Sequence, residues 1–153
     1  MEKAGVAIDR KQLEEFGTML AQRIADCEAL RFISLPSSVE HIGESAFAGC
    51  GTLQEIDIPE KISEIYPETF QDCVRLRRVG FPQGLKRIGL CAFENCSSLT
   101  NVQLPAGTKR IGKSAFLHCV NLTLRMGDYV LTAGANNPLS VFERVILKNN
   151  KLR

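Results

Sequence analysis

A unit of 23 residues recurs four times along this chain of 153 residues. Each unit opens with leucine, places one aliphatic residue three positions later and an apolar residue two further on, and then has a proline. The leading leucines are Leu30, Leu53, Leu76 and Leu99, and Leu122 begins an incomplete fifth unit. Such a repeat indicates a solenoid, because one unit cannot bury its own apolar face and needs neighbours that continue a common core.

The first half of each unit predicts a short strand. In the second unit, Ile56 and Ile58 are two positions apart, which places both side chains on one face of an extended chain. The following Pro59 has no N–H to donate to a sheet and therefore ends the strand. Stacking of the units then brings equivalent strands together in a parallel sheet.

The second half of each unit carries apolar residues three positions apart, in the patterns Val-x-x-Ile-Gly and Ala-Phe-x-x-Cys. This spacing suits a tight turn or a short helical piece that packs from the other side. At Gly43, Gly89 and Gly112 we expect either a positive φ or a close approach to a neighbouring unit. We interpret the recurring cysteines as a stacked column of small buried hydrophobic residues, with the phenylalanines as a second structural column. The two columns are Cys27, Cys50, Cys73, Cys96 and Cys119, and Phe47, Phe70, Phe93 and Phe116.

The complete pattern, L-x-x-I-x-L-P-x-x-V-x-x-I-G-x-x-A-F-x-x-C, resembles the leucine-rich repeat of the BspA-like family over roughly residues 30–121. The resemblance implies an α/β fold, a right-handed curved leucine-rich-repeat solenoid with a parallel β-sheet on its concave side. It also implies a surface role for some relatives, since many family members bind host proteins. A fragment of a surface adhesin is therefore one alternative function.

We expect a single domain over residues 1–153, with four repeats over 30–121 and a cap at each end. Leu13, Phe16, Leu20 and Ile24 recur at helical spacing, which predicts an N-terminal capping helix over residues 9–29. An irregular C-terminal cap should cover residues 122–153. Within it, the alternation of Leu122, Leu124 and Met126 before Gly127-Asp128 predicts a hairpin. Residues 142–147 are compatible with a closing strand, but also with a helix that starts at Asn137-Pro138.

Charge is divided unevenly along the chain. Residues 1–75 carry 7 Lys/Arg and 14 Asp/Glu, and residues 76–153 carry 12 Lys/Arg and 3 Asp/Glu. The halves therefore have net charges of −7 and +9, although the whole chain has a net charge of only +2. This asymmetry bears on partners rather than on the fold, and it makes head-to-tail self-association one possibility.

Residues that flank the inward strand positions should point away from the core and differ between repeats, as expected of a binding face. We predict partner binding by this outward row, in which Phe32 could anchor a partner or lie under the N-terminal helix. A second outward set is basic and could meet an acidic protein surface or phosphates. The first set is Phe32, Glu55, Asp57, Arg78, Asn101 and Gln103, and the second is Lys86, Arg87, Lys109 and Arg110.

No motif of a catalytic, metal-binding or cofactor-binding site occurs in the sequence. His41 and His118 occupy different repeat positions, and no Cys-x-x-Cys is present. We therefore expect a non-enzymatic protein-binding module, such as an inhibitor or adaptor, with no cofactor. Binding of nucleic acid or another polyanion is a second alternative, although no aromatic residues interleave with the basic set.

The sequence predicts no insertion into a membrane, because no apolar run approaches the ~18 residues of a spanning helix. The N-terminal stretch also lacks the apolar segment of a signal peptide. We expect a cytoplasmic protein, or a mature exported form that has lost its signal.

Overall fold

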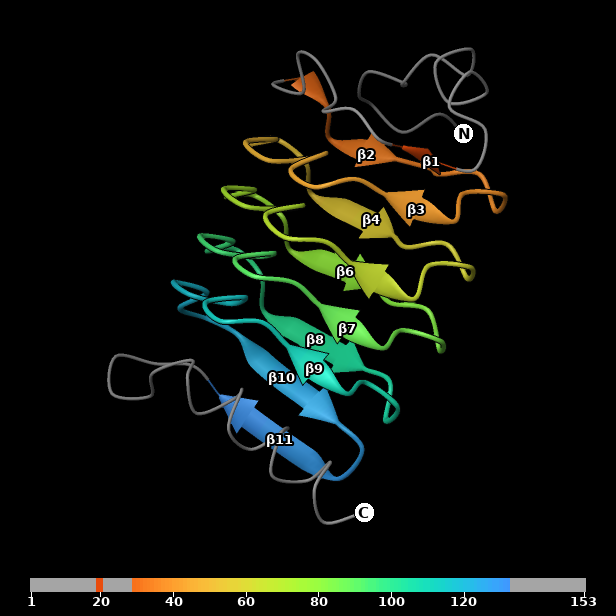
Figure 1. Ribbon diagram of the computed structural model, residues 1–153. Coiled ribbons are helices and arrows are strands. Elements are labelled where there is room, and N and C mark those ends of the chain that lie inside the picture. Colours follow the sequence, from red (N-terminus) through yellow and green to blue (C-terminus); the bar gives the residue numbers. More distant parts are fainter. Residues whose placement is uncertain (1–18, 21–28, 133–153) are drawn as a thin grey trace.

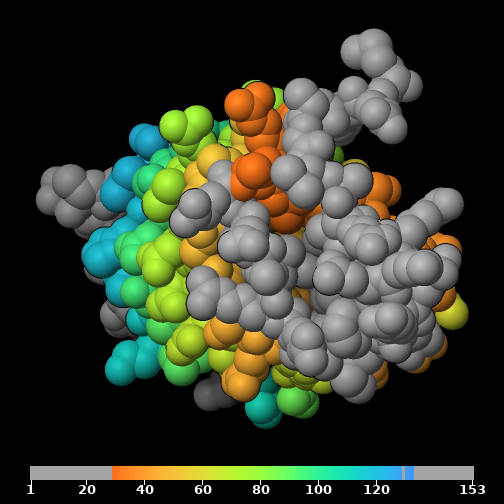
Figure 2. Space-filling view, turned by 90° about the horizontal axis from the view of Figure 1, so that it is seen from above, coloured from red at the N-terminus to blue at the C-terminus, as the bar shows by residue number. Residues whose placement is uncertain are grey.

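The computed structural model describes residues 19–20 and 29–132, and these form a solenoid of short parallel strands (Figure 1). Each turn of the solenoid contributes one strand from each half of its repeat, so that two stacks of strands run along the molecule. Viewed from above, successive turns lie one behind another, from orange through green to blue (Figure 2).

The first stack contains the strands expected from the Leu-x-x-Ile-x-Leu pattern. One sheet has the order β2-β4-β6, with β2 at Phe32–Ile33, β4 at Glu55–Asp57 and β6 at Arg78–Gly80. A second sheet follows it, with the order β11-β10-β8, where β8 is Asn101–Leu104, β10 is Thr123–Met126 and β11 is Tyr129–Thr132. All neighbours are parallel except β10 and β11, which form the predicted hairpin. Gly127 has a positive φ of 58° in the two-residue loop of that hairpin.

The second stack shows that the Val-x-x-Ile half begins with the expected tight turn, but the turn leads into a short strand and not into a helical piece. Its strands are β3 at His41–Ile42, β5 at Glu64–Ile65, β7 at Arg87–Ile88 and β9 at Arg110–Ile111. The apolar residues are three positions apart because a turn precedes each of these strands. The amide of Leu85 donates to the carbonyl of Pro82 at 3.2 Å, and the chain then extends so that Gly89 N donates to Ile65 O at 2.7 Å. Parallel pairing with the neighbouring turn satisfies the backbone there.

The helix predicted over residues 9–29 is also wrong, since Met19–Leu20 form strand β1, which pairs in parallel with β3. No α-helix occurs anywhere in the part of the chain that the structure describes. The helical spacing has another explanation. Phe16, Ile24 and Cys27 lie 23 residues before Val39, Phe47 and Cys50, so this segment carries a degenerate copy of the repeat. Most of it, like the 142–147 segment, lies outside the described residues.

One apolar core lies between the two stacks and continues through all the turns. The four phenylalanines of the predicted structural column are at most 2% exposed. The Ile56 and Ile65 side chains enter the core from opposite stacks. Successive phenylalanine rings are stacked, with centroids 5.3, 5.1 and 5.3 Å apart. The core therefore fixes the backbone of each turn and leaves the outward positions free to vary.

The turns that close each repeat place two residues in the left-handed region of φ. These positions recur at intervals of 23 residues and are not the expected glycines. One column is Ser45, Glu68, Cys91 and Ser114, and the other is Gly49, Asp72, Asn95 and His118, with φ between 54° and 75°. Gly89 and Gly112 instead fulfil the second expectation, a close approach to the preceding turn.

Candidate partner-binding surfaces

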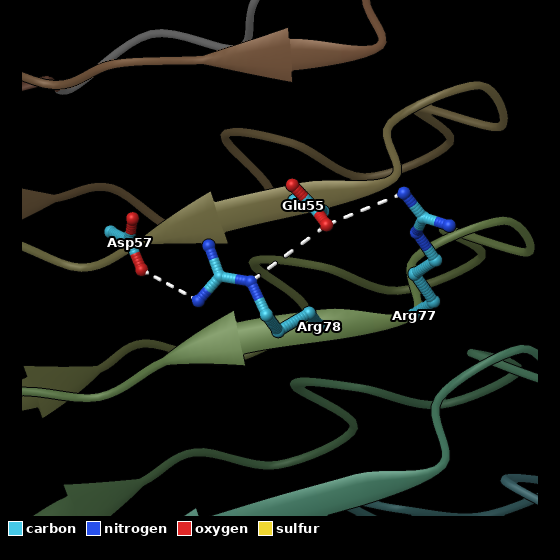
Figure 3. Close-up of polar contacts among 4 residues, drawn as sticks. All are labelled: Glu55, Asp57, Arg77 and Arg78. Carbon is cyan, nitrogen blue, oxygen red and sulfur yellow. Dashed lines mark hydrogen bonds and ion pairs between the residues drawn. The ribbon is translucent and has the colours of Figure 1, made fainter.

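The outward face of β4 and β6 carries a network of ion pairs that we call the strand-face network, formed by Glu55, Asp57, Arg77 and Arg78 (Figure 3). Arg78 Nη1 lies 2.9 Å from Asp57 Oδ1, and its Nε lies 3.9 Å from Glu55 Oε1. Arg77 Nη2 lies 3.3 Å from the same Glu55 oxygen. The parallel register explains these contacts, because Glu55 lies opposite Arg78.

Asp57 lies opposite Gly80 in this register, and a side chain at Gly80 would collide with the Asp57 carboxylate. Glycine at this position therefore leaves room for the carboxylate to meet Arg78. The hydrogen bond that Arg78 donates to Asp57 raises the pKa of Arg78 above its ordinary value. Since both side chains are substantially exposed, the pair contributes only about 0–1 kcal/mol to stability, and the network chiefly orders the surface.

The remaining residues of the predicted first set lie on the same stack. Phe32 is half-buried in β2, opposite Glu55, and the segment expected to cover it lies mostly outside the described residues. Asn101 and Gln103 are exposed on β8, which lies next to β6 (Figure 1). The structure thus assembles the first set on one face, and it adds Arg77, which the sequence reasoning missed. The signal for Arg77 was its position directly before the outward Arg78.

The second set lies on the other stack and forms what we call the basic patch, Lys86, Arg87, Lys109 and Arg110. Arg87 in β7 is the register partner of Arg110 in β9, and Lys109 N donates to Lys86 O at 2.8 Å. All four side chains are exposed. The two sets therefore belong to two separate surfaces, because they lie on different stacks that share one core.

A polar ladder along the closing turns was not predicted. Asn95 Nδ2 donates to Asp72 Oδ1 at 2.6 Å, and His118 Nδ1 lies 2.8 Å from Asn95 Oδ1. These residues occupy one left-handed column, and Asn, Asp and His are among the residues that tolerate this conformation best. Their recurrence after 23 residues was the available signal.

The described members of the cysteine column are buried, and their thiols also bond between turns. The Sγ atoms of Cys73, Cys96 and Cys119 each donate to a phenylalanine carbonyl of the preceding turn at 3.1 Å. Burial raises the pKa of Cys73 and of Cys119 to about 12. Cys50 is equally buried, but it is disulfide-bonded and therefore not a free thiol.

Cys91 lies outside the column and is half-buried. Desolvation, together with a hydrogen bond to Glu94, raises the pKa of this thiol to about 11, which does not favour a nucleophile at neutral pH.

In residues 29–132 no group of three or more His, Cys, Asp or Glu side chains is arranged to hold a metal ion. The described residues also contain no helix with the length and apolarity needed to cross a bilayer.

Residues 21–127 match the model of the BspA type leucine-rich repeat region, in six copies. The chain belongs to this family. The six matched copies include residues 21–28, which agrees with a degenerate repeat before the four regular ones. Leucine-rich repeats of this kind are a general protein-interaction module.

Several solved structures resemble this chain, and two of them are leucine-rich repeat proteins from Bacteroides ovatus and T. pallidum. The protein from Bacteroides ovatus is 36% identical over 65% of this chain, with a TM-score of 0.62. The protein from T. pallidum is 34% identical over 81% of this chain, with a TM-score of 0.65. The chain spans only 26% of the first protein and 60% of the second. No curated protein matches the chain.

Proposed function

We propose that this protein is a non-enzymatic protein-binding module, an inhibitor or adaptor that recognises its partner through the outward face of the first stack. One observation carries the proposal. The backbone of the turns is repeated, but the outward position of the strands changes from Phe32 to Glu55, Arg78 and Asn101. A constant scaffold that presents a different side chain at each turn is suited to recognition.

The strand-face network supports this proposal because it restrains its charged side chains before a partner arrives. Arg78 is held between Glu55 and Asp57, so less side-chain entropy is lost when these groups meet a partner than for unrestrained side chains. Phe32, at the adjacent position, adds the kind of large apolar side chain that often dominates binding energy.

The test is affinity capture from the source organism with the wild-type chain and with the triple variant Glu55→Ala, Asp57→Ala, Arg78→Ala. We expect a reproducible protein partner that the wild-type chain retains and the variant loses. A matched control replaces three exposed residues of the other stack and loops, Glu60→Ala, Lys61→Ala and Ser63→Ala. Equal capture by all three proteins would contradict the proposal for this face. Circular dichroism establishes that the variants are folded.

A further inference from the structure

The basic patch contains only positively charged residues, whereas the strand-face network pairs its arginines with carboxylates. Parallel neighbours are separated by about 4.8 Å, so Arg87 and Arg110 begin side by side on β7 and β9. Like charges at directly opposed positions of a sheet destabilise it, by up to about 1 kcal/mol for each pair. Arg78 has no such cost from its β4 neighbour, because its register partner on β4 is Glu55.

Within the described residues, no carboxylate forms an ion pair with Lys86, Arg87 or Arg110. The ammonium of Lys86 also extends over the turn at Gly107, where an added Cβ would lie 3.2 Å from Nζ. Lys86, Arg87 and Arg110 are therefore open to an anionic group from outside, and Arg87 and Arg110 lie on paired strands.

The limits of the patch indicate how large that anionic group can be. Toward the N-terminal end, the register partner of Arg87 is Glu64, and Glu40 is exposed one turn further on. A long polyanion that followed the stack beyond Arg87 would pass over these carboxylates and be repelled by them. Among the residues that the structure describes, the positive surface of this stack thus spans two turns, which suits a compact cluster of negative charges.

An exposed apolar side chain borders the patch. Leu90 is 46% exposed and follows β7 by two residues, and the neighbouring turn places Lys113 beside it, since Cys91 N donates to Lys113 O. A partner protein can bury a leucine next to its carboxylates. A sugar–phosphate chain gains little from this contact, and no aromatic residue of the patch offers its bases a stacking surface.

We propose that the basic patch is the docking site for a compact acidic cluster on a protein, with carboxylates on Lys86, Arg87 and Arg110 and an apolar residue on Leu90. This inference rests on the proposed function, because it takes the partner to be a protein, but it assigns a second surface and a partner chemistry. Nucleic acid is the competing occupant that the experiment must separate.

The first measurement uses a labelled short peptide of alternating glutamate and glycine that ends in leucine, titrated with the full-length chain at low salt. We expect saturable binding, and a loss of at least about tenfold in affinity for the double variant Arg87→Glu, Arg110→Glu. The matched control is Arg75→Glu, Arg125→Glu, which changes the net charge equally at exposed positions away from the patch. It should bind within about twofold of the wild-type chain.

The inference would be overturned by no saturable binding of the peptide, by an equal loss in both double variants, or by tighter binding of a single-stranded oligonucleotide than of the peptide at the same salt concentration. Leu90→Ser should weaken binding of the peptide more than binding of the oligonucleotide, and the opposite order would also count against a protein ligand.

Capture experiments distinguish the two proposals. If the captured partner depends on the strand-face network but not on the patch, the proposed function stands and this inference fails.

Discussion

Gly112 is the residue whose replacement the structure constrains most directly. An added Cβ would lie 2.5 Å from Leu90 N and 2.6 Å from Gly89 C, and both of these are backbone atoms of the preceding turn. The turns would have to separate, because no flexible side chain can move aside. We expect Gly112→Ala to lower the free energy of unfolding by about 1–3 kcal/mol in denaturant titrations.

Gly84 provides the control for this prediction. It is exposed, and an added Cβ would meet nothing within 4 Å. Gly84→Ala should therefore change the free energy of unfolding by less than about 0.5 kcal/mol. If the two alanine variants lost equal stability, close approach would not explain the glycine column.

The thiols should react in a fixed order as pH rises. The pKa of Cys91 is raised to about 11, so little thiolate is present at neutral pH, and alkylation should be slow and should accelerate toward that pKa. Cys73, Cys96 and Cys119 are buried and should remain unmodified while the chain is folded. Alkylation with iodoacetamide, followed by peptide mass spectrometry, measures each site. Labelling of Cys96 as fast as Cys91 in the folded protein would contradict the burial of the column.

The same pKa shifts predict that stability declines in alkali. A thiol ionises near pH 8.5 in the unfolded chain, whereas the folded state holds the pKa of Cys73 at about 12. Below the pKa of the thiol in the unfolded chain, the thiol is protonated in both states, and its full contribution to the free energy of unfolding is present. Above it only the unfolded chain loses its proton, so the free energy of unfolding should fall from about pH 9 to about pH 12. Denaturant titrations at stepped pH measure this slope, which should become shallower in Cys73→Ala.

At the scale of the element, the phenylalanine stack acts as a continuous spine of the core. Phe93 lies between Phe70 and Phe116 and also forms a T-shaped pair with Phe81, with ring centroids 5.7 Å apart. Phe47 has one described ring neighbour in the stack. Each aromatic pair contributes about 0.5–1.5 kcal/mol beyond its buried area. We therefore expect Phe93→Leu to cost about 1–3 kcal/mol more than Phe47→Leu in thermal or denaturant unfolding. Equal losses would show that ring contacts add nothing to burial.

The elements differ in how far the sequence could predict them. The first-stack strands and the hairpin at Gly127-Asp128 follow from alternation and turn chemistry, which are local signals. Strands such as Arg87–Ile88 have only two residues, too few for alternation to appear, and they exist because the neighbouring turn supplies hydrogen bonds. The wrong prediction of a helix over residues 9–29 has the same origin. Apolar residues three or four positions apart suit one face of a helix, but they also arise where turns separate short strands.

The candidate site could be predicted only in part for a similar reason. Periodicity identified Glu55 and Arg78 as outward residues on neighbouring turns, and the register confirmed that they are opposite each other. It could not show that Arg78 would lean toward Asp57, because that contact depends on the missing side chain at Gly80. The sequence separated the two outward sets, but it did not show that the second half of each repeat builds its own stack of strands.

At the scale of the whole molecule, the repeat makes one deletion tolerable and another not. Removing residues 76–98 joins Arg75 to Leu99, so every inward column stays in register in a shorter solenoid. We expect a cooperative unfolding transition with unchanged circular dichroism per residue, but with a lower midpoint because fewer turns stack. Removing only residues 76–86 shifts the columns and should abolish the transition. Similar behaviour of both deletions would contradict a solenoid held together by register.

The hydrogen bonds between turns have a mechanical consequence. Side-chain bonds such as Arg78–Asp57 and Cys96–Phe70 join residues only 21–26 positions apart, which is the adjacent turn. A force that pulls the chain lengthwise therefore loads one inter-turn contact at a time. Under tension the molecule should unfold in successive, similar steps that each release one turn. The remaining turns would still present the surfaces described above.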